Sequence, residues 1–352
     1  MSLERLSVVG VRNLASVEIE PGSGLNWLQG PNGAGKTSVL EAIYLLARGR
    51  SFRSQKIASV IQHGVDELRV VARRRDSGRR LGMARSSSGW RGRIDGLDSQ
   101  RLSEFARALP LVLMEPDSHR LVDGGPDLRR QYLDWQLFHV EQGYLDLWRR
   151  YARFLKQRNA ALKAQAEDAV IDAIEAPMVA AGGGINRARQ KQVETIGQVL
   201  EQLATELPFR LPGRLSLRYR PGHPTEQDLG EALGDFRDRD RELGYTRRGP
   251  HRANLVLSCG ERPAAEELSR GQQKLLALLL LLAQLRLLIA GAPVAPLLLL
   301  DDPVSELDAP HLETLLEWLS VQQVQTWVTA TLPCPRPASV FHVEQGEIRP
   351  VV

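Results

Sequence analysis

Eight consecutive residues have the types and the order needed to hold the phosphates of a nucleotide. Glycines at such a place let several backbone N–H groups point into one concavity around an anion. A lysine then reaches the β- and γ-phosphates, and the next hydroxyl binds Mg²⁺. ATP and Mg²⁺ are therefore the predicted ligands. The eight residues form a complete Walker A motif: Gly30, Pro31, Asn32, Gly33, Ala34, Gly35, Lys36 and Thr37.

Two adjacent carboxylates can supply the rest of this chemistry. Asp301 and Asp302 follow four leucines at 297–300. Such a run is typical of a strand buried on both faces of a parallel sheet, and these sheets bind ligands at the carboxyl ends of their strands. We predict that Asp301 holds Mg²⁺ together with Thr37, and that Asp302 orients or deprotonates the attacking water. The predicted catalytic residues are Lys36, Asp301 and Asp302.

A third motif, Leu-Ser-Arg-Gly-Gln-Gln-Lys at 268–274, precedes a leucine-rich helix. It resembles the signature motif of ABC ATPases, with Arg270 where that family usually has glycine. A serine at a helix amino terminus can hold a γ-phosphate. In the ABC fold the signature contacts nucleotide bound to a second subunit, and the D-loop, which residues 305–308 resemble, crosses between subunits. The resemblance therefore implies a site completed in a dimer by Ser269, Gly271, Gln272 and Asp308.

The elements that must position these motifs follow from hydrophobic periodicity. Helices are predicted at 38–47, 271–290 and 310–320, and also at 128–162 and 168–207, the last broken near the glycines at 182–184. A loop and a short helix are expected at 222–245. Strands are predicted at 3–9, 16–19, 25–29, 69–72, 81–84, 91–94, 111–114, 215–219, 254–258, 296–300, 325–329 and 340–343.

This order of elements predicts an α/β fold. We expect an ABC-type ATPase head, with a mixed sheet around a P-loop core, and a helical second lobe with a short antiparallel helical arm. The ATPase lobe would take 1–115 and 246–352, and the helical insertion 116–245. The signature helix, 268–290, would complete the second lobe.

Basic residues are concentrated in one segment of the chain. Residues 48–101 hold 14 Lys and Arg against 5 Asp and Glu, a net +9, whereas the whole chain has +4. This asymmetry predicts a polyanionic partner, with a solvated surface hairpin as the alternative. Contacts to phosphates would bind DNA with little sequence preference, and no aromatic run indicates single-strand stacking. The candidate DNA contacts are Arg50, Arg53, Lys56, Arg73, Arg74 and Arg75, with Arg129, Arg130 and 156–158 as the alternative surface.

Composition and cysteine use indicate a cytoplasmic protein. Cys259 and Cys334 lack metal-site spacing and are expected to be free thiols. We see no signal peptide. The longest apolar run, 275–289, is interrupted by Gln284 and Arg286, and we interpret it as too short and too polar to span a membrane.

With these motifs in hand, the chain resembles the RecF family of bacterial recombination mediators over essentially its whole length. Residues 11–14, Val-Arg-Asn-Leu, match a segment that the resemblance puts near the adenine, and so implicate Arg12 and Asn13 in nucleotide binding. At 249–252 the match is Gly-Pro-His-Arg, although Asn254 stands where aspartate is usual. Further matching segments lie at 49–53, 124–134 and 156–159.

The RecF resemblance implies an ATP-dependent homodimer that binds duplex or gapped DNA. With RecR and RecO it would help to load RecA in recombinational repair, replication restart and the SOS response. Ala330 stands where ABC transporters carry a switch histidine, and Asp302 replaces their catalytic glutamate; RecF proteins share both features. We therefore expect weak, DNA-stimulated ATP hydrolysis that acts as a switch.

Two other functions stay open at this point. One is the nucleotide-binding subunit of a membrane transporter, against which the missing histidine, the basic segment and the long helical arm argue. The other is a scaffold that binds ATP and never hydrolyses it. Phosphate release no greater than that of a Lys36→Met variant would leave only the scaffold.

Overall fold

The computed structural model describes residues 2–351, whose contacts divide the chain into two compact units. Unit 1 takes in the described residues up to Ser118, Ala204–Phe209, and everything described from Leu281 onward. Unit 2 consists of His119–Leu203 and Arg210–Leu280. The lobe boundaries predicted from the sequence, 1–115 with 246–352 and 116–245, remain a prediction.

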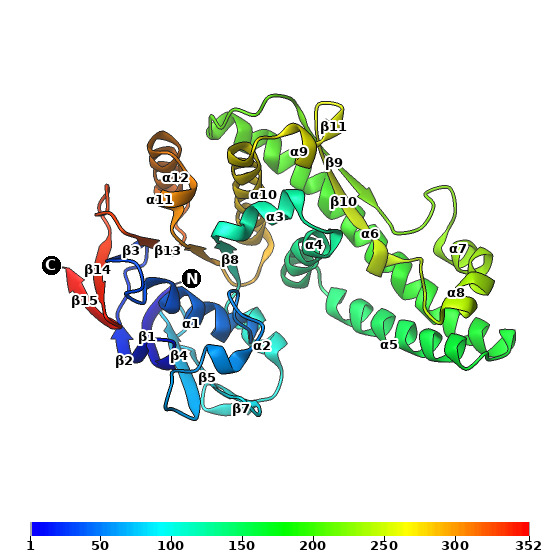
Figure 1. The fold of residues 1–352 in the computed structure, drawn as a ribbon, viewed down its shortest axis with the longest axis horizontal. Helices are drawn as coiled ribbons and strands as arrows, with labels where there is room; N and C mark the ends of the chain where they lie inside the picture. The colour runs from blue at the N-terminus through cyan, green and yellow to red at the C-terminus, as the bar shows by residue number, and fades with distance from the viewer. Residues whose placement is uncertain (1, 352) are drawn as a thin grey trace. The chain divides into compact units, whose positions relative to one another are not determined.

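The first sheet of unit 1 is antiparallel, with the strand order β2-β1-β4-β5-β6-β7. In β4 buried residues alternate with less buried ones, because one face packs against α1 (Lys36–Arg48) in the core and the other is open (Figure 1). The strands are β1 (Leu3–Val11), β2 (Leu14–Ile19), β4 (Glu67–Arg74), β5 (Arg80–Ser86), β6 (Trp90–Ile94) and β7 (Leu97–Ser99).

The second sheet of unit 1 has the order β15-β14-β3-β13-β12-β8 and is parallel except for β15. Every residue of β12 and β13 is buried, which explains their apolar sequences. Because β13 lies between β3 and β12, the carboxyl ends of all three meet at one edge. The strands are β3 (Leu25–Gln29), β8 (Leu111–Met114), β12 (Leu297–Leu300), β13 (Thr326–Ala330), β14 (Ser339–Glu344) and β15 (Glu347–Val351).

A buried glutamine ties the two sheets of unit 1 together. Gln325, just before β13, accepts a hydrogen bond from Leu3 N (2.8 Å) and donates to Leu3 O (2.9 Å), at the start of β1. The amide thus satisfies both backbone groups of a buried residue. The remaining elements of the unit are η1 (Ile57–Ser59), α2 (Leu102–Ala108), η2 (Pro116–His119, which ends one residue inside unit 2), α11 (Pro303–Glu306) and α12 (Ala309–Val321).

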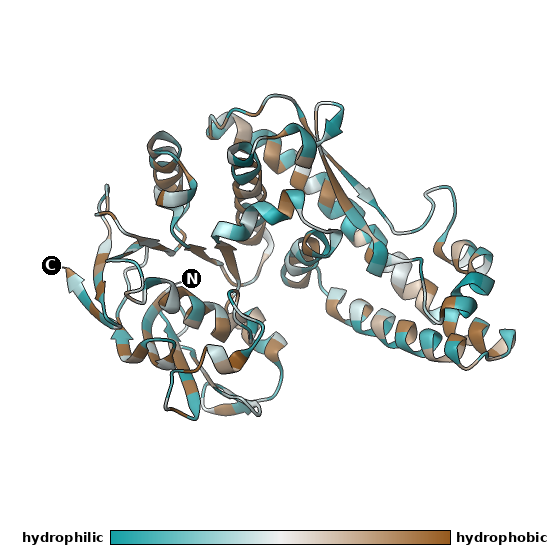
Figure 2. Cartoon of the chain, viewed as in Figure 1, coloured by the Kyte–Doolittle hydropathy of each residue, from teal (hydrophilic) through white to brown (hydrophobic). Residues whose placement is uncertain are grey.

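Unit 2 is mainly helical, with an antiparallel sheet of order β11-β10-β9. Helix α5 is amphipathic, with both apolar and polar residues along its length, as expected for a helix with one packed face (Figure 2). Two of its helices, α6 and α10, run on into unit 1. The elements are α3 (Arg120–Asp123), α4 (Pro126–Val140), α5 (Tyr144–Lys163), α6 (Asp168–Glu206), β9 (Leu215–Arg220), α7 (Leu229–Asp235), α8 (Arg237–Leu243), η3 (Pro250–Arg252), β10 (Asn254–Cys259), β11 (Arg262–Pro263), α9 (Ala264–Glu267) and α10 (Arg270–Gly291).

Two helix predictions were wrong, and glycine explains both. The helix expected at 128–162 is two helices, because Gly143 takes φ 84° between α4 and α5. The break expected at 182–184 does not occur, since α6 is one helix of 39 residues. A Cβ at Gly182 would lie 2.5 Å from Leu229 Cδ2, so this glycine permits close packing against α7. The α/β fold with a mixed sheet and a helical part is confirmed.

Helix α10 is more apolar than the sequence analysis allowed. Over residues 2–351 it is the one helix long and apolar enough to cross a membrane, with a mean hydropathy of 2.0. This mean is taken over an 18-residue window of the helix, and 61% of the residues in that window are buried by the protein itself. The core helix of a soluble protein has the same property, so this helix is weak evidence for a membrane span.

Candidate nucleotide site

The Walker A loop connects β3 to α1 in a conformation that requires glycine. Gly35 takes φ 117°, which L side chains rarely adopt. A Cβ at Gly30 would lie 2.1 Å from Val343 O in β14. No side chain caps the amino terminus of α1. Its backbone N–H groups and the positive end of its dipole are therefore available to an anion.

The Lys36 ammonium lies inside this loop. Its Nζ donates to Gly30 O at 2.8 Å and to Pro31 O at 2.9 Å. Burial lowers the pKa of Lys36, and the charges of Asp302 and Asp301 oppose that shift. The amine is held by carbonyl groups that it can exchange for phosphate oxygens.

Thr37 and Asp301 meet, although they are far apart in the sequence. Thr37 Oγ1 donates to Asp301 Oδ1 at 2.7 Å. Burial raises the pKa of Asp301, and hydrogen bonds from the Thr37 and Thr329 hydroxyls counteract this rise. Thr329 Oγ1 donates to the same Oδ1 at 2.8 Å. The sequence analysis did not single out Thr329; a polar residue in a fully buried strand is the signal that could have found it.

Asp302 stands in a strained turn beside this pair. Its backbone has φ 49° and ψ 51°, a left-handed conformation uncommon outside glycine. Its Oδ2 accepts a hydrogen bond from Ser305 Oγ at 2.6 Å. Its Oδ1 is buried, and no residue of the described chain donates to it. An orphaned carboxylate oxygen next to the Thr37–Asp301 contact is suited to bind a water or a cation.

The oxygens at this edge of the sheet fit Mg²⁺. Neighbouring ligands of an octahedral Mg²⁺ lie about 3 Å apart, and Thr37 Oγ1 and Asp301 Oδ1 are 2.7 Å apart. Residues 2–351 contain no cluster of three or more His, Cys, Asp or Glu that could hold a metal. Mg²⁺ here would therefore need phosphate and water oxygens, as is usual for this ion.

Asn13 and Arg12 lie beside the Walker A loop. Asn13 contacts the loop and the start of α1, and Arg12 contacts a carboxylate further along α1. The Asn13 amide donates to Ala34 O at 3.0 Å and accepts from Ser38 Oγ at 3.1 Å. Arg12 makes two hydrogen bonds, of 2.8 and 2.9 Å, to the carboxylate of Glu41 on α1. Glu41 is fully buried and was missed from the sequence. A single carboxylate among apolar residues of the Walker helix is the signal that could have indicated it.

The loop after α1 is attached to the same carboxylate. Ser51 Oγ donates to Glu41, and Arg53 Nη1 lies 3.8 Å from Glu41 Oε2. The Arg53 charge also opposes the rise in the pKa of Asp301 that burial causes. Arg53, a candidate DNA contact, is therefore directed toward the nucleotide site, and like Arg50 and Lys56 on the same loop it is exposed.

The signature residues are grouped at the start of α10. Ser269 N donates to Gln272 Oε1 (3.0 Å) and Gln272 N to Ser269 Oγ (3.4 Å), a reciprocal capping arrangement. Ser269 and Gly271 are exposed, and Gly271 would have open space around a Cβ. In the other motif, Asp308 caps α12 by accepting from His311 N at 2.9 Å.

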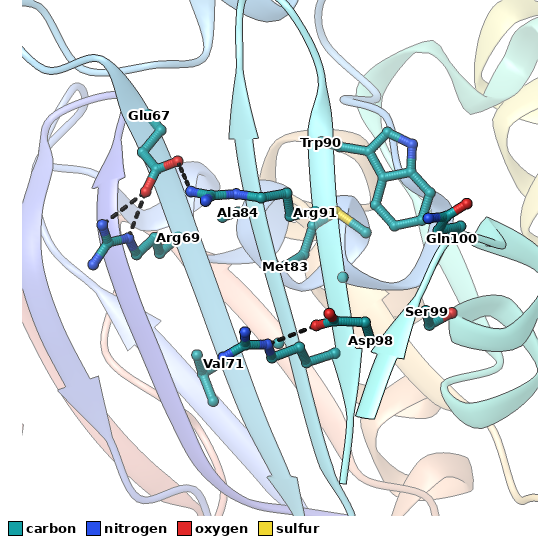
Figure 3. Close-up of a pocket in the computed structure, with 13 residues that line it drawn as sticks. Glu67, Arg69, Val71, Met83, Ala84, Trp90, Arg91, Asp98, Ser99 and Gln100 are labelled. Carbon is teal, nitrogen blue, oxygen red and sulfur yellow. Dashed lines mark hydrogen bonds and ion pairs between the residues drawn. The ribbon is translucent and has the colours of Figure 1, made fainter. Parts of the chain in front are cut away.

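Several basic residues of the 48–101 segment form ion pairs with neighbouring acids. Arg74 is buried and holds Asp76 (2.7 Å) and Ala108 O (3.3 Å), so it is corrected from a DNA contact to a structural residue. On the open face of the first sheet, Glu67 lies between Arg69 and Arg91, beside a hollow of about 740 Å³ (Figure 3). The Arg75 guanidinium donates to Pro21 O. Exposed pairs such as Arg73–Glu4 (3.3 Å) are weak and can exchange partners.

The alternative basic surface is largely used by the fold of unit 2. Arg158 is fully buried, with Glu175 and Asp240 each at 2.7 Å. Arg129 donates to Asn254 Oδ1 at 3.0 Å, so the asparagine that departs from the RecF pattern still supplies an acceptor. Arg130 donates to Ala253 O at 2.7 Å. Lys156 alone of the four stays exposed.

Comparison with known proteins decides the family. The family model for the RecF/RecN/SMC N terminal domain matches residues 2–333. The chain is 42% identical to the DNA replication and repair protein RecF of Xanthomonas axonopodis pv. citri (strain 306), covering 99% of this chain and 98% of that protein. The chain belongs to the RecF family. The RecF of Thioalkalivibrio sulfidiphilus (strain HL-EbGR7) is 40% identical, with 99% of each chain covered.

Solved structures share the fold of this RecF-family chain. The recombination mediator protein RecF with ATP superposes with a TM-score of 0.89 at 24% identity, covering 99% of this chain and 97% of that one. An SMC head bound to the C-winged helix domain of ScpA superposes with a TM-score of 0.60 at 16% identity, covering 100% and 97%. The ABC/SMC type of head expected from the motifs is thereby confirmed.

Two of the RecF-like segments meet inside unit 2. Asp134 of α4 accepts two hydrogen bonds, of 2.8 and 2.9 Å, from the buried guanidinium of Arg189 in α6. Trp148 Nε1 of α5 donates to Asp134 at 2.9 Å. Arg189 also donates to Pro250 O at 2.7 Å, within the Gly-Pro-His-Arg segment. This polar centre joins α4, α5 and α6 to the turn at Pro250, which accounts for the aspartate of the first segment.

His251 of the same turn predicts a pH-dependent stability. Its Nε2–H donates to Thr246 O (3.0 Å), so Nδ1 must accept from the Tyr151 hydroxyl (2.7 Å). Burial, together with the charges of Arg252, Arg130 and Arg158, lowers the pKa of His251 to about 4. A lowered histidine pKa means that the unfolded chain binds the proton more tightly. The contribution of His251 to the free energy of unfolding should therefore be constant above pH 6.5. It should fall by roughly 3 kcal/mol as the pH is lowered to 4.

Urea unfolding at several pH values measures this effect. A His251→Gln variant, which does not titrate in this range, supplies the background slope from the other groups. Equal slopes for the two proteins between pH 4 and 6.5 would show that His251 is not a buried neutral group.

Proposed function

We propose that this RecF-family chain is an ATP-dependent DNA-binding protein of recombinational repair and replication restart. The observation that carries the proposal is the contact between Thr37 Oγ1 and Asp301 Oδ1 beside the Lys36 loop. It brings together a phosphate loop, a hydroxyl and a carboxylate, the groups that P-loop ATPases use. The named relatives act in DNA replication and repair.

In this proposal each residue of unit 1 has one task. Lys36 exchanges Gly30 O and Pro31 O for phosphate oxygens, and the uncapped start of α1 holds the same phosphates through N–H groups. Thr37 and Asp301 would hold Mg²⁺, which neutralises phosphate charge when bound. Asp302 Oδ1, buried and without a donor in the described chain, orients the attacking water. Arg12 and Asn13 border the loop, and the family resemblance puts their segment near the adenine.

The turnover should be slow. Asp302 is shorter than the glutamate of ABC transporters, and it is already bonded to Ser305. At the end of β13, where transporters carry a histidine, Ala330 is buried and offers only its carbonyl, to Gly30 N at 3.3 Å. Slow hydrolysis suits a switch whose ATP state persists long enough to act.

We propose further that the site is completed by a second copy of the chain. Ser269 and Gly271 are exposed at the start of α10, where a helix dipole and a hydroxyl can receive a γ-phosphate. Asp308 lies on the turn that would cross between the copies. ATP would then close a homodimer, and hydrolysis would open it.

DNA would be held through its phosphates, independently of sequence. Arg50 and Lys56 are exposed on the loop after α1, and Arg73 on the open sheet face has only an exposed pair to break. Arg53 connects this loop to Glu41 and so to the Walker helix. RecR and RecO are proposed protein partners, since a related solved RecF is assigned to the RecFOR pathway. RecA is proposed from the family resemblance. We place the protein in the cytoplasm.

The test is DNA affinity in three nucleotide states. We expect tighter binding to duplex and gapped DNA with ATP than with ADP or without nucleotide, because only the ATP state closes the dimer. Lys36→Met should remove the ATP effect. Ser269→Arg should bind ATP normally but fail to dimerise in sedimentation, and its DNA affinity should stay at the nucleotide-free level.

Four results would contradict parts of this proposal. If DNA affinity is the same with ATP, with ADP and without nucleotide, and also in Lys36→Met, ATP does not control DNA binding. An unchanged dimer in Ser269→Arg would remove the split site. ATP binding with phosphate release equal to that of Lys36→Met would leave a scaffold, and co-purification with a membrane protein would favour the transporter subunit.

A further inference from the structure

Thr329 connects the two acidic residues of the candidate site. It is the fourth residue of β13, between the strand that leads to the phosphate loop and the strand that leads to Asp301. Its side chain is fully buried. Asp302 N donates to Thr329 Oγ1 at 2.8 Å, and Thr329 Oγ1 donates to Asp301 Oδ1 at 2.8 Å. One hydroxyl thus touches both residues.

The direction of these two hydrogen bonds is fixed by chemistry. The backbone N–H of Asp302 can only donate, so it uses a lone pair of the hydroxyl. The single hydroxyl proton of Thr329 is then directed to Asp301. Thr37 places a second hydroxyl proton on the same Oδ1. The rotation of the Asp301 carboxylate is therefore set from two sides, one on α1 and one on β13.

The backbone contact also holds a strained turn. Left-handed φ and ψ at a residue other than glycine cost about 1 kcal/mol or more and persist only when the surroundings impose them. The hydrogen bond from Asp302 N to Thr329 is made at the strained residue itself. It fixes the peptide from which the Asp302 side chain, with its buried Oδ1, projects.

We propose that Thr329 is a positioning residue for ATP hydrolysis, because its hydroxyl sets the orientation of the Asp301 carboxylate and of the Asp302 turn. The inference rests on the proposed ATPase function. With alanine at position 330, Thr329 is the side chain of β13 that makes a polar contact with these acids. The hydroxyl contributes geometry and does not touch the nucleotide.

The variants Thr329→Val and Thr329→Ser separate this role from packing. Valine keeps the shape and removes both hydrogen bonds, whereas serine keeps the hydroxyl. Thr326→Val is the matched control, since Thr326 is buried in the same strand and its hydroxyl bonds locally, to Val324 O at 3.3 Å. We measure kcat and KM for ATP, the Mg²⁺ dependence of ATP affinity at equilibrium, and the melting temperature.

For Thr329→Val we expect kcat to fall about tenfold or more, with KM changed by less than about twofold, as for a group that acts mainly in the transition state. The Mg²⁺ concentration for half-maximal ATP affinity should rise by about threefold or more. Thr329→Ser and Thr326→Val should stay within about twofold of the parent protein in both quantities.

Parent-like kcat and Mg²⁺ dependence in Thr329→Val would overturn the proposal, as would equal losses in the valine and serine variants. If valine prevents folding, Thr329→Cys, which keeps the shape and only a weak donor, replaces it with the same expectations. Should the parent protein release no more phosphate than Lys36→Met, the proposed ATPase fails by itself. The Mg²⁺ dependence of ATP affinity then still decides the role of Thr329.

Discussion

Asp301→Asn should strongly reduce ATP hydrolysis and leave the protein folded. Both hydroxyls at this site donate to Oδ1, which asparagine retains, so the contacts with Thr37 and Thr329 can persist. What disappears is the negative charge that would hold Mg²⁺. Burial raises the pKa of Asp301, so the charged form is costly in the folded protein and a neutral amide should not destabilise it. We expect a loss on the order of 100-fold in kcat.

Phosphate release and the melting temperature of the same preparations test this prediction. ATP affinity with Mg²⁺ should fall in Asp301→Asn to the level seen with a chelator. Asp98→Asn, at an exposed carboxylate of the same unit, is the control and should hydrolyse ATP like the parent. A parent-like rate in Asp301→Asn would exclude Asp301 as the metal-binding carboxylate.

The largest loss of stability is expected from Asp134→Ala in unit 2. Arg189, whose guanidinium is fully buried, would lose the carboxylate with which it forms an ion pair at 2.8 Å. Removing one partner of a buried ion pair costs about 3–5 kcal/mol, because the other charge is left uncompensated. Trp148 and Tyr144 lose their acceptor as well. The free energy of unfolding in urea should fall by this amount.

Two comparisons distinguish the buried pair from an ordinary surface charge. Asp146→Ala breaks an exposed pair with Arg149 on α5 and should cost less than about 1 kcal/mol. The double variant Asp134→Leu with Arg189→Met, which removes both charges of this buried pair, should be more stable than Asp134→Ala. If Asp134→Ala and Asp146→Ala unfold at the same urea concentration, the polar centre does not stabilise unit 2.

Motifs with fixed local geometry could be predicted from the sequence. The glycines and the lysine of the Walker loop fix a backbone shape by their own chemistry, and the structure has that shape, with Lys36 inside the loop. Four leucines before two aspartates likewise predicted β12, because apolar runs of this length are buried strands in parallel sheets. These properties belong to neighbouring residues and need no knowledge of the rest of the chain.

Glycine and arginine gave errors where packing decides their role. Near 182–184 glycines predicted a helix break, but Gly182 is required by the approach of Leu229. Arg74 was counted as surface charge, but it is buried against Asp76 and Ala108. Leu229 and Ala108, the groups that decide these two roles, are far from Gly182 and Arg74 in the sequence, and residue type alone does not reveal them.

The sequence by itself determined the family, the phosphate loop and the acidic residues that face it. Only the tertiary structure decided which side chains hold those acids in place. Thr329 reaches Asp301 because β13 inserts between β3 and β12, and Glu41 binds Arg12 because α1 packs on the first sheet. The physical reason is that a buried polar side chain needs a hydrogen-bond partner. The order of the strands decides which groups lie close enough to be that partner.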